Sequence, residues 1–96
     1  MIIAQVLFPQ SEPMALETAT GIFQSTAKRY EGRAGLLRKH YMRAEDGMFA
    51  GAIYLWESRE AAEATYTDEW RAMVTEKYGA PPQIQFFDAP VTVDNT

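Results

Sequence analysis

Residues 48–57 constrain the fold most, because this predicted strand is apolar on both of its faces. Alternate side chains of a strand point to opposite sides. One side would carry Phe49, Ile53 and Leu55, and the other Met48, Ala50, Ala52, Tyr54 and Trp56. An antiparallel strand with one wet face should instead alternate apolar with polar residues. Both faces must therefore be shielded from water. We expect helices to pack on one face and the sheet of a second copy of the chain to pack on the other.

The first half of the chain predicts a strand, a helix and a second strand. Residues 2–8 are short, apolar and β-branched, and they end at Pro9. A helix is expected to begin at 11–13, a Ser-Glu-Pro sequence typical of a first turn. It runs to residue 30 along an apolar stripe, and a close approach of helix to sheet would be one reason to tolerate Gly21 within it. Residues 36–43 then form the second strand.

The second half predicts the hairpin partner, two helices and a last strand. Asp46-Gly47 is a strong hairpin turn signal before the strand that begins at residue 48. Ser58 and Thr67 are the expected N-caps of two helices separated by a break near residue 66. Gly79 is placed to end the second of them in a left-handed conformation. Residues 83–88 form the last strand, and 90–96 are a tail that could extend to a partner subunit.

This order of elements, β-α-β-β-α-β, predicts an α+β protein of the ferredoxin-like class. The sheet would be four-stranded and antiparallel, with the helices on one face. The 96 residues allow one domain. A chain this short buries a modest share of its surface, which also favours a homodimer joined through the sheet faces.

The composition excludes several classes of function. There is no cysteine, and therefore no disulfide, thiolate nucleophile or cysteine-built zinc site. The net charge is −4 without a dense basic cluster, which argues against a nucleic-acid partner. No apolar run is long enough for a membrane span, and the N-terminus lacks the basic region of a signal peptide. We expect a cytoplasmic protein without a membrane partner.

Two segments resemble a known family. They are residues 35–39, Gly-Leu-Leu-Arg-Lys, and 50–58, Ala-Gly-Ala-Ile-Tyr-Leu-Trp-Glu-Ser. Over 35–66 the chain is similar to the YdhR-like monooxygenases of the dimeric α/β-barrel superfamily, with Trp56 in place of a phenylalanine and Ala52 in place of a glycine. The resemblance implies a dimer whose sheets face each other around a pocket. It also implies oxidation of aromatic substrates without metal or flavin, so no cofactor is expected.

Lys39 and His40 are the candidate catalytic residues. A lysine facing a dry pocket has a lowered pKa and could deprotonate a phenol. The single histidine could exchange a proton near neutral pH, and its alternative interpretation is an ordinary strand histidine. The two point to opposite faces, so at most one lines a given pocket. Leu37 and Tyr41 are expected to share the Lys39 face, although a bulge near 46–47 would change the pairing. One histidine without a partner makes a metal site improbable.

Four aromatic residues are candidate ligand contacts: Tyr41, Tyr54, Trp56 and Trp70. Tyr54 and Trp56 share a face with two alanines, a pattern that suits either a flat apolar ligand or packing in the dimer interface. Trp70 belongs to a group of apolar residues at helical spacing. Such a group is more often part of the core than of a binding site, but Trp70 could close one mouth of the barrel. A ligand site of this kind requires a pocket of about 300 Å³ or more.

Two classes of function remain open at this point. One is a cofactor-independent monooxygenase acting on a phenol- or quinol-like molecule. The other is a non-catalytic dimeric binding protein for a small apolar ligand. The fold alone does not choose between them, because function depends on the site.

Overall fold

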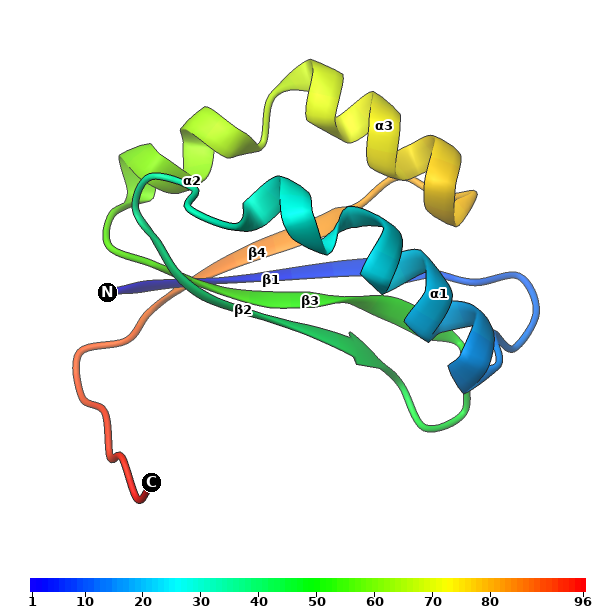
Figure 1. Ribbon diagram of the computed structural model, residues 1–96, viewed down its shortest axis with the longest axis horizontal. Helices are drawn as coiled ribbons and strands as arrows, with labels where there is room; N and C mark the ends of the chain where they lie inside the picture. The colour runs from blue at the N-terminus through cyan, green and yellow to red at the C-terminus, as the bar shows by residue number, and fades with distance from the viewer.

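The computed structural model describes residues 1–96 and confirms the ferredoxin-like α+β fold (Figure 1). The elements in chain order are β1 (Ile2–Pro9), α1 (Leu16–Ala27), a short 3₁₀ helix η1 (Lys28–Tyr30), β2 (Leu36–Arg43), β3 (Phe49–Trp56), α2 (Arg59–Thr65), α3 (Asp68–Tyr78) and β4 (Gln83–Asp88). No helix has the length and apolar character that crossing a membrane requires.

The four strands form one antiparallel sheet in the order β2-β3-β1-β4. The first strand of the chain therefore lies inside the sheet, between β3 and β4. Ile2 pairs with Trp56 on one side and with Asp88 on the other. All three α-helices lie on the same side of this sheet (Figure 1). One face of the sheet is thus covered within the subunit, and the opposite face is left open.

The covered face is the one that carries Tyr54 and Trp56. Both side chains are buried, at 2% and 0% exposure, together with Ala50 and Ala52 earlier on the same face of the strand. On the open face, Ile53 and Leu55 are half-buried and Phe49 is 37% exposed. The structure therefore assigns Tyr54 and Trp56 to the core beneath the helices and not to a sheet-to-sheet interface.

Three of the four predicted helix ends are confirmed by their local bonds. The Ser58 and Thr67 hydroxyls accept hydrogen bonds from the backbone N–H groups of Ala61 and Trp70, at 3.2 and 3.1 Å. Gly79 ends α3 with a φ of 72°, in the left-handed region that glycine adopts without strain. Each of these signals acts within a few residues of its own position, which is why the sequence reveals it.

The predicted start of α1 at 11–13 is wrong, because the helix begins at Leu16. The hairpin between β2 and β3 holds the preceding backbone. The Met14 N–H donates to the carbonyl of Gly47 at 2.9 Å, and Arg43 Nε donates to the carbonyl of Met14 at 2.6 Å. Ala15 then stands at the N-cap without a side-chain bond. Contacts from a distant part of the chain therefore override the local helix signal.

Two further expectations need correction. The bulge in β2 lies between Leu36 and Arg38, not near the turn. Leu36 packs against the core while Leu37 is 51% exposed, so Leu37 does not share the buried face with Lys39. Gly21 does not mark a close approach of helix to sheet, because a β-carbon added there would meet nothing within 4 Å.

Candidate functional site

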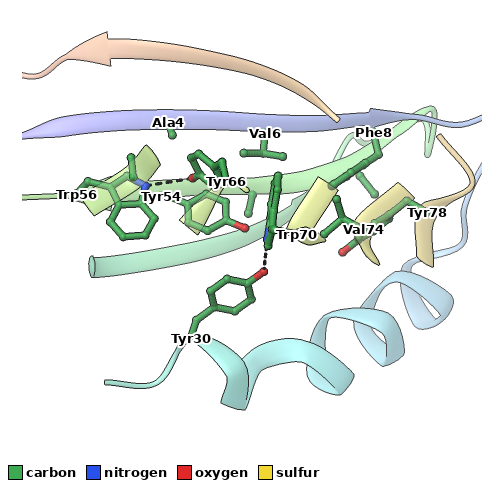
Figure 2. Close-up of a cluster of buried hydrophobic side chains, with 13 residues drawn as sticks. Ala4, Val6, Phe8, Tyr30, Tyr54, Trp56, Tyr66, Trp70, Val74 and Tyr78 are labelled. Atoms are coloured by element: carbon green, nitrogen blue, oxygen red, sulfur yellow. Dashed lines mark hydrogen bonds between the residues drawn. The ribbon is translucent and has the colours of Figure 1, made fainter. Parts of the chain in front are cut away.

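A small enclosed cavity lies between the sheet and helices α1 and α3. Its volume is about 10 Å³, which is room for one water molecule. Three predicted site residues line it: Lys39, Tyr41 and Tyr54. Figure 2 shows why the space is small: Phe8 and Tyr78 lie face to face beside it, with ring centroids 4.1 Å apart. The enclosed space is therefore far below the ligand-sized pocket expected from the sequence.

Two open grooves supply the space that the cavity lacks. One, of about 430 Å³, runs along the β2 edge and is lined by Lys39, Tyr41 and Tyr30, among others. The other, of about 490 Å³, lies between η1 and the α2–α3 junction and is lined by Tyr30 and Trp70, among others. Tyr30 lines the cavity and both grooves. A ligand of aromatic size therefore fits at the grooves and reaches the Lys39 amine from the β2 edge.

The Lys39 amine is surrounded by tyrosine rings. Its Nζ atom lies 3.4 Å from the ring centroid of Tyr30, 3.9 Å from that of Tyr41 and 4.6 Å from that of Tyr54. It has no carboxylate partner, since the only ion pair in the chain joins Arg59 and Glu63. Lys39 is thus a buried amine among aromatic faces with no opposite charge.

Burial lowers the pKa of Lys39 to about 6. The ring faces act in the opposite direction, because each attracts a cation by about 0.5–2 kcal/mol. Loss of hydration is the larger effect, since an ammonium taken out of water without a carboxylate partner loses several kcal/mol. The direction is therefore downward, and at neutral pH a substantial share of Lys39 is an uncharged amine that can accept a proton.

Tyr41, Tyr54 and Tyr78 stay protonated at neutral pH. Burial raises the pKa of Tyr54 well above its ordinary value and also raises the pKa of Tyr41 and Tyr78. The Tyr41 hydroxyl is held by the Thr26 hydroxyl at 2.7 Å. The site therefore combines the Lys39 amine with uncharged aromatic walls, an environment suited to a flat phenolic molecule, and Lys77 is a second lysine in the lining of the cavity.

His40 does not join Lys39 in this site. It pairs with Ile53 on the open face of the sheet, and its side chain is exposed. The prediction that the two residues point to opposite faces is confirmed by the pairing of Lys39 with Tyr54. His40 could act only in a space formed on the open face.

The two tryptophans make equivalent bonds but differ in position (Figure 2). Trp56 Nε1 donates to the Tyr66 hydroxyl at 3.1 Å, deep in the core and away from the cavity lining. Trp70 Nε1 donates to the Tyr30 hydroxyl at 2.9 Å, on the floor of the groove beside η1. Trp70 thus stands at a mouth of the site, whereas Trp56 supports the core.

Sequence reasoning missed Tyr30 as a site residue. The sequence pattern places it only at the end of the apolar stripe of a helix. Its ring lies over Lys39, its hydroxyl accepts from Trp70, and it meets Tyr54 edge-on at 5.8 Å. No local signal identifies it, because its partners lie on other elements of the fold.

Comparison with known proteins gives a likeness of fold. No family model matches the chain, and no curated protein sequence does. The YdhR-like resemblance therefore stays a prediction. One of the solved structures that resemble this chain is called an antibiotic biosynthesis monooxygenase, and a second, from Nitrosomonas europaea, is called a putative one.

A third solved structure is a monooxygenase from the gene ActVA-Orf6 of Streptomyces coelicolor, in complex with nanaomycin D. It is 20% identical with a TM-score of 0.71, over 99% of this chain and 92% of that one. Another is SnoaB, a cofactor-independent oxygenase from Streptomyces nogalater. It is 17% identical with a TM-score of 0.67, over 96% and 95% of the two chains. At these identities the likeness establishes the shared fold.

Proposed function

We propose that this protein is a cofactor-independent monooxygenase acting on a phenol- or quinol-like aromatic molecule. The observation that carries the proposal is the buried Lys39 amine, with its lowered pKa, among Tyr30, Tyr41 and Tyr54. The proposal is also supported by the fold that the chain shares with SnoaB, which is described as a cofactor-independent oxygenase.

In this proposal Lys39 acts as the general base. Its Nζ atom accepts the phenolic proton of the substrate, and the resulting phenolate is electron-rich enough to reduce O₂. The substrate supplies all the electrons, one oxygen atom enters the substrate, and the other leaves as water. Tyr41 provides an aromatic wall of the groove at the β2 edge, and Tyr54 lies behind the amine in the enclosed cavity. Trp70 bounds the site from the α3 side.

The test is oxygen uptake with a panel of hydroquinones and anthrone-like molecules. Lys39→Met should reduce the rate by about 10²-fold or more, the usual share of general-base catalysis. Lys28→Met is the matched control, since Lys28 is exposed on η1 and outside the cavity. Loss of activity in His40→Ala with full activity in Lys39→Met would contradict the proposal and move the chemistry to the open face.

The second candidate is a non-catalytic binding protein for a small apolar ligand. The observation that favours it is the enclosed volume of about 10 Å³, which requires a ligand to rest in the grooves. Tight binding of anthrone-like molecules without oxygen uptake would establish this candidate and rule out the oxygenase.

We propose in addition that the subunit forms a homodimer through its open sheet face. Ile3 pairs with Leu55 on β3 and with Phe87 on β4, so three apolar side chains stand side by side across the sheet. Leu7 and Ile53 lie on the same face, around Gln5, which pairs with Ile53 and Gln85. Phe87 is 41% exposed. Exposed apolar side chains grouped in this way favour a protein partner. The sheet of a second copy has the matching shape and character.

A further inference from the structure

The groove beside η1 is lined by more basic than acidic residues, although the chain as a whole is acidic. Arg29 and Arg33 both line it, and Glu69 is its only acidic lining residue. The chain as a whole has a net charge of −4. Two arginines therefore line one open space of about 490 Å³ in a chain of net negative charge, and the Arg33 guanidinium is held there by Thr65 and Ala64, which also line it.

Arg33 is held in place without being neutralised. Its Nε donates to the Thr65 hydroxyl at 2.8 Å, and its Nη2 donates to the carbonyl of Ala64 at 3.1 Å. Both acceptors are uncharged, and neither Arg33 nor Arg29 has a carboxylate within ion-pair distance. The full charge of an oriented guanidinium thus remains available to a ligand. Guanidinium groups are suited to bind carboxylates through paired hydrogen bonds.

A single side chain separates this groove from the Lys39 amine. Tyr30 lines both spaces, with its ring over Lys39 Nζ and its hydroxyl accepting from Trp70 on the groove side. The arginines and the amine therefore lie on opposite sides of one aromatic residue. A flat molecule that displaces or stacks against Tyr30 would place one end near each.

We infer that the Arg29–Arg33 groove binds a carboxylate substituent of an aromatic substrate whose phenolic end faces Lys39. The inference rests on the proposed function and narrows it to aromatic acids. Arg29 and Arg33 are specificity-determining residues in this view, because they contact a part of the substrate that does not react. Glu69 at the rim opposes the anion and makes the position of the carboxylate more selective.

Two stable probes differ by the relevant group alone. Rhein is a dihydroxyanthraquinone carboxylic acid, and aloe-emodin carries a hydroxymethyl group in place of the carboxyl. Binding of each to the full chain is measured by calorimetry at pH 7.5. Rhein should bind about tenfold more tightly or better, since a charge-assisted hydrogen bond contributes about 1.5–3 kcal/mol. Arg33→Gln should remove this preference by lowering the affinity for rhein to that for aloe-emodin.

Further variants separate charge from folding. Arg33→Lys keeps the charge and should keep most of the preference for rhein. Arg29→Gln removes a side chain that makes no hydrogen bond in the structure, so reduced rhein binding there cannot result from misfolding. Arg71→Gln is the matched control, because Arg71 is exposed on α3 outside the groove. Equal binding of the two probes to the wild type, or binding of neither, would overturn the inference.

Oxygen uptake with neutral anthrone distinguishes this inference from the proposed function. That uptake is measured for the wild type and for Arg71→Gln and should be the same in the two, because Arg71 lies outside the cavity and the groove and anthrone has no carboxylate. Anthrone oxidation together with equal binding of rhein and aloe-emodin would overturn the carboxylate site alone. Arginine-dependent preference for rhein without any oxygen uptake would support the carboxylate site and reject the oxygenase.

Discussion

The Nζ atom of Lys39 lies 3.4 Å from the centroid of the Tyr30 ring. The hydroxyl of the same tyrosine accepts the indole N–H of Trp70 at 2.9 Å. The amine, the phenol and the indole therefore form one continuous chain from β2 through η1 to α3. This chain joins the two layers of the fold at the place where the cavity and both grooves meet.

Lys39→Met should make the protein more stable at neutral pH. The unfolded chain keeps the lysine proton up to a pKa of 10.5, whereas the folded chain keeps it only below about 6. Above pH 10.5 the lysine is neutral in both states and does not lower the free energy of unfolding. As the pH falls from 10.5 towards 6, the unfolded chain binds a proton that the folded chain does not, so the free energy of unfolding decreases. The loss is at most about 1.4 kcal/mol per pH unit, and the ring contacts and partial exposure reduce it.

The measurement is urea unfolding of wild type and Lys39→Met between pH 6 and pH 9. The advantage of the variant should grow as the pH is lowered through this range. Lys28→Met should differ from the wild type by a constant amount, since Lys28 is exposed. A pH-independent difference for Lys39→Met would show that the amine does not titrate in this window.

Tyr30→Phe should destabilise the protein by about 1–3 kcal/mol. The substitution removes the acceptor of the Trp70 N–H, and Trp70 is only 7% exposed, so the donor is left without a partner. In a domain of this size each 1 kcal/mol lowers Tm by about 4–8 °C. A thermal scan measures the change. The same substitution in a Trp70→Phe background should cost less, and an equal cost in both backgrounds would argue against the bond.

Gly51→Ala and Gly21→Ala should have opposite effects on stability. A β-carbon at Gly51 would overlap the carbonyl oxygen of Val6 on the neighbouring strand, so β1 and β3 would have to separate locally. We expect a loss of about 3 kcal/mol. At Gly21 the space is empty and the position is inside α1, so alanine should add about 1 kcal/mol. Chemical denaturation of both variants measures the difference, and a tolerated Gly51→Ala would contradict the β1–β3 register.

Leu55→Asp should convert the proposed dimer into a monomer. Leu55 lies opposite Ile3 in the apolar row of the open face, and a carboxylate there would be buried against a partner sheet without compensation. Sedimentation equilibrium at micromolar concentration measures the mass. Gln24→Asp, on the exposed side of α1, is the control and should remain dimeric. A monomeric wild type would remove the dimer proposal itself.

The sequence revealed those features of the fold that depend on near neighbours. The order of the elements, the caps at Ser58 and Thr67 and the left-handed Gly79 all follow from local chemistry. The start of α1 did not, because Met14 is bonded to a hairpin formed more than 25 residues later. A contact between distant parts of the chain produces no regular spacing in the sequence. A helix cap, in contrast, can be recognised from residues a few positions apart.

The candidate site could be predicted only in part for the same reason. The alternation of side chains placed Lys39 and His40 on opposite faces, as observed. Which of them faces the helices depended on the pairing of β2 with β3 and on which face the helices cover. The importance of Tyr30 depended on three partners from β2, β3 and α3.

The position of β1 inside the sheet has a consequence for the synthesis of the protein. β1 requires two partners, and the second of them, Gln83–Asp88, is made after every other element of the fold. Until then one hydrogen-bonding edge of Ile2–Pro9 has no neighbour and can pair with other chains. The sheet is therefore completed only after residue 88 has been made, and a nascent chain halted before residue 83 would be prone to aggregate.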